Sequence, residues 1–388
     1  MNPLPSTDFD SSLVELLRQD PYPVYDRLRE LARVLWSPSP GLWVVTGHRE
    51  AAAVLTDPNS SVQEDTVEDG SKRSILDLDP PDHTRLRALV QRAFTPRVVA
   101  GLAPKIQTIV DDCCERALER GGLDLMDELA SPLPVTVIAE LLGVPPEERA
   151  VFRQWSDDLI AHLEPIRTEE EQRRADTASE ELRQYLAGII ERRRHDPGED
   201  LLSKLIEVEE QGESLTTQEL ITMAVLLLVA GHETTVNLIG NGIWALLQHP
   251  DQWRRLQENP DLIETAVEEL LRYDSPVQMT SRTPKRDMEL GGQQISARQV
   301  VVLFLGAANR DPEEFECPDR LDIGRHPNHH LSFSRGIHFC LGAPLARLEG
   351  RIAIGTVARR LPSLHPDGEA RRRSYVNLRG FVTMPLAV

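Results

Sequence analysis

One stretch, Phe333-Ser334-Arg335-Gly336-Ile337-His338-Phe339-Cys340-Leu341-Gly342, holds a single cysteine between two glycines. A helical pattern follows it directly, from Ala343 to Glu349. Gly336 and Gly342 permit backbone conformations and close approaches that a side chain would block, so a flat cofactor can lie against this loop. The amides of the first helical turn, with the helix dipole, stabilise a thiolate at Cys340. The segment therefore predicts a thiolate ligand to a metal.

The same segment resembles the cysteine-ligand loop of the cytochromes P-450, the haem-thiolate monooxygenases. The resemblance implies that Cys340 binds the iron of haem b, that Phe333 shields the sulfur and that His338 contacts a haem propionate. It also assigns Gly342 to the cofactor. The alternative is a buried, inert cysteine before a helix, and the rest of the chain must decide between them.

Composition places the chain among soluble globular proteins. It has 388 residues, of which 40% are apolar and 27% are charged, and its longest apolar run is far below the roughly 20 residues of a membrane span. The N-terminus has no basic start and no apolar core of a secretory signal, which indicates a cytoplasmic protein. The four cysteines give no disulfide framework, as expected in a reducing compartment.

The charge balance argues against two kinds of partner. There are 43 basic and 62 acidic residues, a net charge of −19. Nucleic acid and anionic membranes attract basic proteins, so neither is expected as the main partner.

The pattern along the chain predicts one mainly α domain with a small β component, spanning residues 1–388. An early helix, about Tyr22 to Ala32, precedes a hairpin of residues 34–36 and 42–45. From Pro81 to about Tyr273 nearly every apolar pattern has helical spacing. Strand patterns return at Val300–Phe304 and near the C-terminus, so strands from both ends could share a small sheet.

The helix from about Thr217 to Gln248 is the best defined. Thr216 and Glu219 form a capping-box pattern, and Leu215 and Leu220 stand where a hydrophobic staple would be. Because residues 223–230 are apolar on every side, this helix is expected to pass through the core.

The middle of this helix carries polar residues in the order Ala230-Gly231-His232-Glu233-Thr234-Thr235. A threonine hydroxyl can bond the carbonyl four residues back and locally open the helix, while Gly231 leaves room for a ligand such as dioxygen. The segment resembles the oxygen-activating segment of the cytochromes P-450, in which an acid and an alcohol deliver protons. By position Glu233 and Thr234 take these catalytic roles. The alternative is a kinked core helix whose polar groups are satisfied internally.

Two further segments fit the same family. Glu269 and Arg272 lie three apart on a helix and therefore face the same way. The resemblance pairs them with Arg320 of Pro318-Asp319-Arg320, as a structural trio.

Haem propionates need cationic or hydrogen-bonding partners, and the candidates are His83, Arg87 and Arg282. Arg85 and Arg92 are expected to face solvent.

Two motifs in the chain point to other cofactors. Gly240-Asn241-Gly242-Ile243-Trp244-Ala245 fits a dinucleotide fingerprint by letter, but it lies mid-helix rather than at a strand-to-helix turn. The histidines His329, His330 and His338 could form a zinc cluster with Cys340, yet no second cysteine pair stands at structural-zinc spacing.

The resemblance covers nearly the whole chain in the family's order. It departs from the family at Ser334 and Arg298, where glycines are common, and at Leu321, where an aromatic residue is common. It implies the triangular-prism helical haem fold of the soluble bacterial type, with electrons from a ferredoxin and a ferredoxin reductase.

The implied activity is insertion of one oxygen atom from dioxygen into a medium-sized hydrophobic substrate. A peroxide-driven peroxygenase and a haem-binding sensor or carrier are the rival functions. Expected pocket walls are the segments 61–78, 226–230, 277–279 and 381–382, with Gln278 as a polar hook.

Overall fold

A computed structural model describes residues 11–63, 74–210 and 215–388. They form two compact units that interleave along the chain. Unit 1 takes the described residues of 1–64, 241–340 and 371–382, and unit 2 takes those of 65–240, 341–370 and 383–388. A single domain over 1–388 stays a prediction from the sequence.

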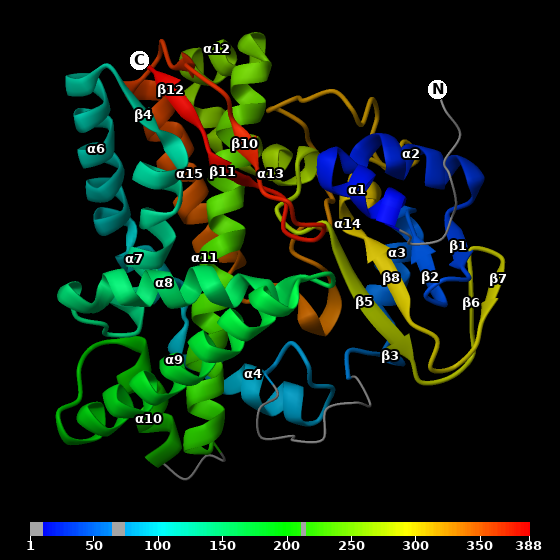
Figure 1. Cartoon of the computed structure of the whole chain (residues 1–388), viewed down its shortest axis with the longest axis horizontal. Helices are drawn as coiled ribbons and strands as arrows, with labels where there is room; N and C mark the ends of the chain where they lie inside the picture. Colours follow the sequence, from blue (N-terminus) through cyan, green and yellow to red (C-terminus); the bar gives the residue numbers. More distant parts are fainter. Residues whose placement is uncertain (1–10, 64–73, 211–214) are drawn as a thin grey trace. The chain divides into compact units, whose positions relative to one another are not determined.

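Unit 1 contains a five-stranded sheet with the order β1-β2-β8-β5-β3 (Figure 1). Its strands are β1 (Val34–Ser37), β2 (Leu42–Val45), β3 (Ser60–Ser61), β5 (Met279–Pro284) and β8 (Val301–Phe304). Strands β2 and β8 run parallel, and the other neighbours are antiparallel. The predicted hairpin of β1 and β2 is confirmed.

Side chains alternate between the two faces of this sheet, as strand geometry requires. On β8, Val301 and Leu303 join one apolar cluster with the buried face of α3 (His48–Thr56). Phe304, on the opposite face, joins a second cluster with α1 (Ser11–Gln19) and α2 (Pro21–Leu31). The sheet is therefore covered on both faces.

The remaining elements of unit 1 are short. They are α12 (Pro250–Glu258), the turn η5 (Pro260–Leu262), α13 (Ile263–Tyr273), β6 (Met288–Leu290), β7 (Gln293–Ile295), α14 (Leu305–Ala308), the turn η6 (Gly336–His338), β10 (Arg371–Arg372) and β11 (Phe381–Thr383), whose last residue falls in unit 2.

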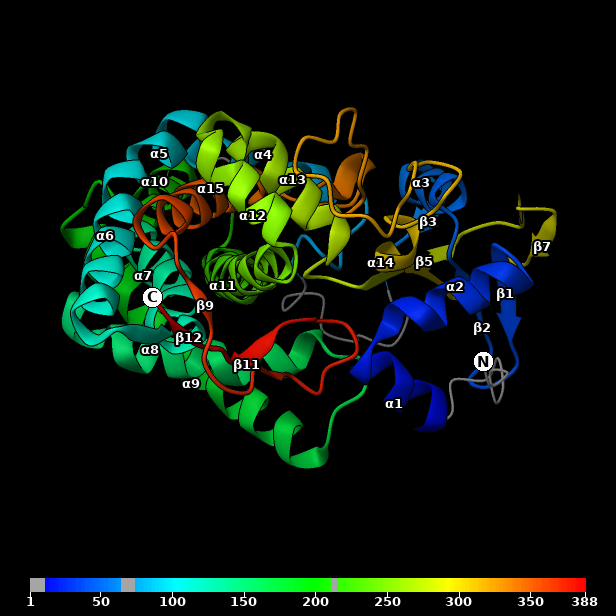
Figure 2. The same cartoon turned by 90° about the horizontal axis from the view of Figure 1, so that it is seen from above.

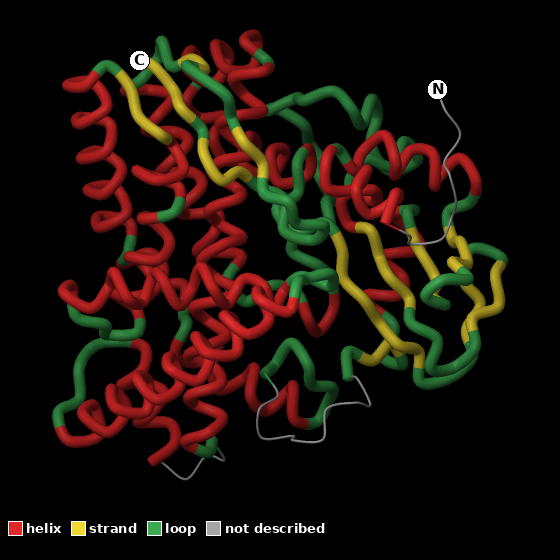
Figure 3. Tube along the Cα trace, viewed as in Figure 1, coloured by secondary structure: helices red, strands yellow, loops and turns green. Residues whose placement is uncertain are grey.

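Unit 2 is mainly helical, as Figure 3 shows in red. Its helices are α4 (Asp82–Ala93), α5 (Pro96–Gly101), α6 (Ala103–Arg120), η2 (Met126–Ala130), α7 (Pro132–Leu141), η3 (Pro146–Glu148), α8 (Arg149–Leu159), η4 (Ile160–Leu163), α9 (Glu169–His195), α10 (Leu201–Glu210), most of α11 (Thr217–Gln248) and α15 (Ala343–Arg360). Several begin at a proline, which suits the first helical position because its N–H would be unbonded there anyway.

The C-terminal strands differ from the expectation. Strand β12 (Pro385–Ala387) pairs with β4 (Gly122–Asp124) and β9 (His365–Pro366) in a separate three-stranded sheet. N-terminal strands instead pair with β5 and β8. Strand patterns alone carry no information on which distant strand is the partner, so the sequence did not separate these sheets.

Helix α11 has the predicted bounds, Thr217–Gln248. Thr216 N donates to Glu219 at 2.7 Å and Glu219 N donates to the Thr216 hydroxyl at 3.2 Å, which confirms the capping box. Figure 2 looks along its axis. It is the one helix, within the described residues, that is long and apolar enough to cross a membrane, but 67% of its most apolar window is buried inside the protein. It is therefore a core helix.

Candidate active site

The cysteine loop of unit 1 is held by its own backbone. Cys340 N donates to the carbonyl of Phe333 at 2.9 Å, and Phe339 N donates to Gly336 at 3.1 Å across the single turn η6. The Cys340 side chain is half-buried, and α15 begins three residues later with Gly342 as its N-cap. The loop therefore presents one thiol just before a helix N-terminus, which favours the thiolate.

The two glycines of the loop have different roles. Gly336 has a φ of +71°, and a Cβ there would lie 2.5 Å from the carbonyl oxygen of Leu55, so only glycine fits. The close neighbour is the last turn of α3 rather than a ligand. Gly342 has a φ of −80°, which any residue adopts. Its special conformation, expected from the sequence, is not found.

Ser334, the position where the family commonly has glycine, adopts a φ of +60°. Its hydroxyl is buried and makes no hydrogen bond to the described residues. A left-handed backbone costs a residue with a Cβ roughly 1–2 kcal/mol. Arg298, the second departure, also has a positive φ, 68°. Both departures therefore occur where a glycine would be relaxed.

We expect Ser334→Gly to raise the free energy of unfolding by about 0.5–1 kcal/mol, because relief of strain exceeds the added chain entropy of glycine in the unfolded state. Denaturant titration of the two proteins measures this. Ser334→Ala removes the same hydroxyl but keeps the Cβ, so it should not reproduce the gain. Equal stability of the glycine variant and the unmodified protein would contradict strain at this position.

The polar segment of α11 is bonded within unit 2. The Thr234 hydroxyl donates to the carbonyl of Ala230 at 2.8 Å, which confirms the predicted bond. The helix nevertheless stays continuous, so the predicted local opening is absent. Glu233 is fully buried. His232 is also fully buried, and its Nδ1 lies 2.6 Å from the Ser156 hydroxyl of α8. This hydrogen bond connects the polar segment of α11 to α8.

Gly231 has a packing role that the sequence did not indicate. A Cβ at this position would lie 2.9 Å from Cδ1 of Ile138 on α7. The space beside the glycine is therefore filled by a neighbouring side chain, which corrects the expectation of an open face for a ligand. Ala230, Gly231 and Thr234 are the half-exposed positions of the segment.

The candidate propionate contacts come from both units. In unit 2, His83 is 2% exposed on α4, one turn before the half-buried Arg87. Burial lowers the pKa of His83, and the charge of Arg87 lowers this pKa further. In unit 1, Arg282 on β5 is 5% exposed and donates to the Ser281 carbonyl at 2.6 Å and to the Thr280 hydroxyl at 3.2 Å. Buried cationic or hydrogen-bonding side chains of this kind suit carboxylate groups.

The position of Arg85 corrects one expectation. It is half-buried and pairs with Glu219 at the start of α11, instead of facing solvent. Arg92 is exposed, as predicted.

The Glu269–Arg272 pair is confirmed as a buried structural element of unit 1. Both side chains are fully buried, with Arg272 Nε 2.7 Å from Glu269 Oε2 and Nη2 2.8 Å from Oε1. The second guanidinium on Glu269 belongs to Arg325, whose Nε lies 3.0 Å from Oε2. Arg320 contributes only its backbone carbonyl to Arg272, at 3.3 Å, and its side chain is exposed. The predicted trio is therefore wrong in its third member.

The expectation for Gln278, in unit 1, is corrected. Gln278 is fully buried; its Nε2 donates to the Ser275 carbonyl at 2.6 Å, and its Oε1 accepts from the Tyr25 hydroxyl at 3.0 Å. These bonds use the amide that was expected to be a substrate hook. Part of the expected pocket wall 61–78, residues 64–73, lies outside the described residues.

The zinc alternative is not supported where the structure is described. His329 Nδ1 lies 3.1 Å from Glu314, and His330 Nε2 lies 3.1 Å from Glu268. Across residues 11–63, 74–210 and 215–388, no group of three or more histidine, cysteine or acidic side chains could hold a metal ion.

Sequence reasoning missed Glu349 of α15. It is 1% exposed, and burial raises its pKa to about 8, while a hydrogen bond with Thr235 lowers this pKa only in part. The carboxyl is therefore mainly protonated at neutral pH. The signal was available, because Glu349 falls four residues after Leu345 and four before Ala353, in an apolar helical row.

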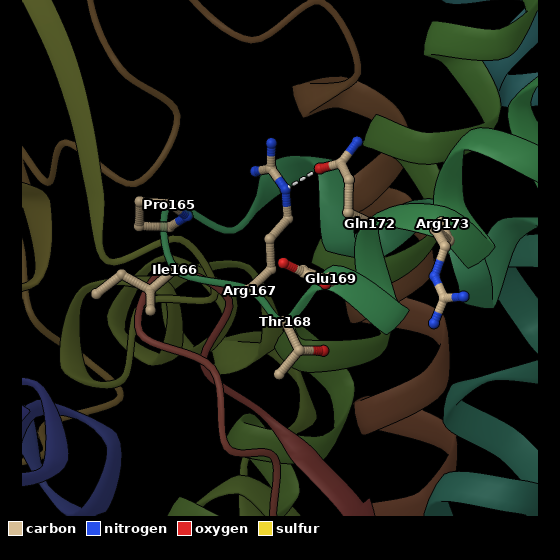
Figure 4. A pocket seen from close by; sticks show the side chains of 7 residues that line it. All are labelled: Pro165, Ile166, Arg167, Thr168, Glu169, Gln172 and Arg173. Carbon is tan, nitrogen blue, oxygen red and sulfur yellow. Dashed lines mark hydrogen bonds between the residues drawn. The ribbon is translucent and has the colours of Figure 1, made fainter.

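Unit 2 also has a surface hollow. It is open and is formed by the segment between η4 and α9 with the first turns of α9 (Figure 4). Its lining residues are Pro165, Ile166, Arg167, Thr168, Glu169, Gln172 and Arg173. None of them was predicted as a site residue.

Comparison with known proteins agrees with this geometry. The family model for Cytochrome P450 matches residues 35–386. The Cytochrome P450 monooxygenase PikC of Streptomyces venezuelae is 45% identical over 384 residues, covering 95% of this chain and 91% of that protein. The chain belongs to the cytochrome P450 family, and it is a monooxygenase of that family.

Two solved structures share the fold. The crystal structure of P450BioI in complex with hexadec-9Z-enoic acid ligated acyl carrier protein has a TM-score of 0.91 and 38% identity, covering 98% of this chain and 100% of that chain. Myxobacterial cytochrome P450 CYP267B1 in complex with myristic acid has a TM-score of 0.89 and 40% identity, covering 98% and 99%. The mainly α fold with a small β component is thereby confirmed.

Proposed function

We propose that this monooxygenase inserts one oxygen atom from dioxygen into a medium-sized hydrophobic organic substrate, by hydroxylation or epoxidation. The Cys340 loop carries the proposal, because it presents one thiol, fixed by the Cys340–Phe333 backbone bond, before the N-terminus of α15. The names of the relatives include a vitamin D(3) 25-hydroxylase, and solved relatives hold myristic acid or testosterone. They therefore support the reaction class and do not point to a single substrate.

The cofactor proposed for this site is haem b with Cys340 as axial ligand. Thiolate-ligated haem supplies the activation of dioxygen, because thiolate donation favours oxygen–oxygen cleavage. Phe333 is 8% exposed and packs near Phe339, with ring centroids 6.3 Å apart, which suits a shield over the sulfur. Arg282, His338, His83 and Arg87 are the proposed propionate contacts. Gly342 of the cysteine loop is proposed to lie against the cofactor.

Two residues of α11 are proposed to handle protons. The Thr234 hydroxyl donates a hydrogen bond to the Ala230 carbonyl, and its oxygen keeps lone pairs that can accept a hydrogen bond from a second donor. Glu233 supplies a carboxyl one residue away in a fully buried position. Glu269 and Arg272 are proposed to act only on structure.

Turnover with isotope-labelled dioxygen and a reductant tests this function. One labelled oxygen atom in the product is the expected result. Product formed from hydrogen peroxide alone would indicate the rival peroxygenase, and haem binding without product from any screened compound would indicate a sensor or carrier.

The electron donors are proposed to be a small acidic ferredoxin and its reductase. Since the protein itself has a net charge of −19, an acidic donor requires local arginines. Arg92 is exposed, and Arg335 and Arg347 are half-exposed near the cysteine loop in sequence. A cytoplasmic location, where such donors occur, is part of the same proposal.

We expect ferredoxin-driven reduction to slow as salt rises, because exposed charges are screened within about 10 Å at 0.1 M ionic strength. Stopped-flow reduction at several salt concentrations measures this. Arg92→Gln should lower the rate at low salt, whereas Arg192→Gln, which removes an exposed arginine of α9, should not. A rate independent of salt would contradict electrostatic docking.

A further inference from the structure

One face of α11 is half-exposed along the middle of this otherwise buried helix. Leu226, Ala230 and Thr234 are all half-exposed and stand four residues apart. Residues at this spacing lie one above another on a helix. Val225, Leu227 and Gly231 beside them are half-exposed as well. Apart from Thr234 this row is apolar, so it is suited to contact an apolar chain.

The row continues by one step of four residues to Thr222, where it meets a charged side chain. Arg183 of α9 donates from Nη1 to the Thr222 hydroxyl at 3.1 Å. Thr222 is 4% exposed, and Arg183 is half-buried. Both belong to unit 2, like the row itself. A guanidinium therefore lies at the end of the row opposite Thr234.

Arg183 differs from the paired arginines of the protein. Within the described residues no carboxylate forms an ion pair with it, and the Thr222 bond uses one of its five N–H groups. Burial lowers the pKa of its guanidinium, and the nearby charge of Glu180 opposes this only in part. Glu180 is itself exposed and accepts from Gln184 at 2.9 Å. The guanidinium of Arg183 therefore has further N–H groups that can donate hydrogen bonds to the anionic group of a ligand.

The spacing along α11 sets the length of alkyl chain that fits between Arg183 and Thr234. Thr222 and Thr234 are twelve residues apart, which corresponds to about 18 Å along the axis at 1.5 Å per residue. An extended alkyl chain advances about 1.25 Å per carbon, given a C–C bond of about 1.5 Å, so about 14 carbons cover this distance.

We propose that Arg183 binds the carboxylate of an elongated aliphatic substrate whose chain lies along Leu226 and Ala230 toward Thr234. The proposal rests on the monooxygenase function above and gives it a substrate class, a long-chain carboxylic acid. Arg183 acts as a specificity-determining residue, because its fork of donors matches a carboxylate and not an ester or a hydrocarbon. Oxidation is directed to the part of the chain far from the carboxylate.

Calorimetric titration of the haem-containing enzyme tests the proposal by binding alone. The probes are a saturated fatty acid of about 14 carbons and its methyl ester, both below their aggregation concentrations. The unmodified protein should bind the acid more tightly than the ester. In Arg183→Gln the Kd of the acid should rise about 10- to 100-fold, the usual range for a lost hydrogen bond to a charged group, while the Kd of the ester stays unchanged.

Three further proteins separate a binding role from a structural one. Arg183→Lys keeps the charge and should retain part of the preference for the acid. Thr222→Val removes the bond that orients Arg183 and should weaken acid binding less than Arg183→Gln does. Arg192→Gln removes an exposed charge from the same helix and should change nothing.

Equal weakening of acid and ester in Arg183→Gln would overturn the proposal, since it would indicate lost packing. Equal affinity of the unmodified protein for acid and ester would also overturn it. In either case the monooxygenase function would still hold if the unmodified protein shows the spectrum of a thiolate ligand and oxygenates another substrate. If the unmodified protein shows neither, the monooxygenase function itself is refuted.

Discussion

Replacing Cys340 by histidine is expected to abolish the red-shifted absorption band of the reduced, carbonyl-treated protein, together with monooxygenase activity. The band depends on a thiolate ligand, and histidine offers a neutral nitrogen instead. The loop should still fold, because its backbone bond from residue 340 to Phe333 does not involve the side chain. Absorbance difference spectra and haem content of the purified variant measure the effect.

The other cysteines lie in surroundings unlike that of Cys340. Cys113 and Cys114 of α6 are buried, and burial raises their thiol pKa values to about 11 and about 12. Burial of this kind disfavours the thiolate, the form in which a cysteine binds a metal. Cys317 is exposed, and Cys317→Ser is a matched control that should keep the band. A red-shifted band in Cys340→His would end the haem-thiolate assignment.

The elements that could be predicted from the sequence carry strong local signals. The start of helix α11 is marked by its capping box at Thr216 and Glu219. Its middle turns are apolar on every side, which distinguishes it from an amphipathic surface helix. The two strands of the β1–β2 hairpin are joined by a proline- and glycine-rich turn. The bond from Thr234 to Ala230 also follows from a spacing of four residues on a helix. In each case the partners lie within one element or its immediate neighbour.

Errors arose where the partner is distant in the chain. Arg320 and Arg325 both precede the cysteine loop, and no local pattern says that Arg325 is the one that contacts Glu269. Gln278 looked like a lone polar group in an apolar segment, but its partner Tyr25 lies 253 residues away. Gly231 looked like space for a ligand because Ile138, which fills that space, belongs to another helix.

Replacing Thr234 by alanine is expected to uncouple electron consumption from product formation. Folding, haem content and substrate binding should survive, because alanine favours the helix and removes little volume. The variant lacks the hydroxyl that donates to Ala230 and lies on the half-exposed face of α11. Without it, proton delivery to dioxygen would slow, so reducing equivalents would appear as hydrogen peroxide. Positioned proton transfer typically contributes roughly 10²–10⁴-fold, so the loss should be clear even if ordered water replaces part of the path.

Product formed per electron consumed, measured together with peroxide released, gives the coupling directly. Thr234→Ser is the matched control, since it keeps a hydroxyl at the same carbon and should restore most of the coupling. If the alanine variant folds, binds haem and couples as well as the unmodified protein, then the hydroxyl is only a helix contact to Ala230. Proton delivery would in that case run through Glu233 or another group, and the catalytic assignment of Thr234 would be wrong.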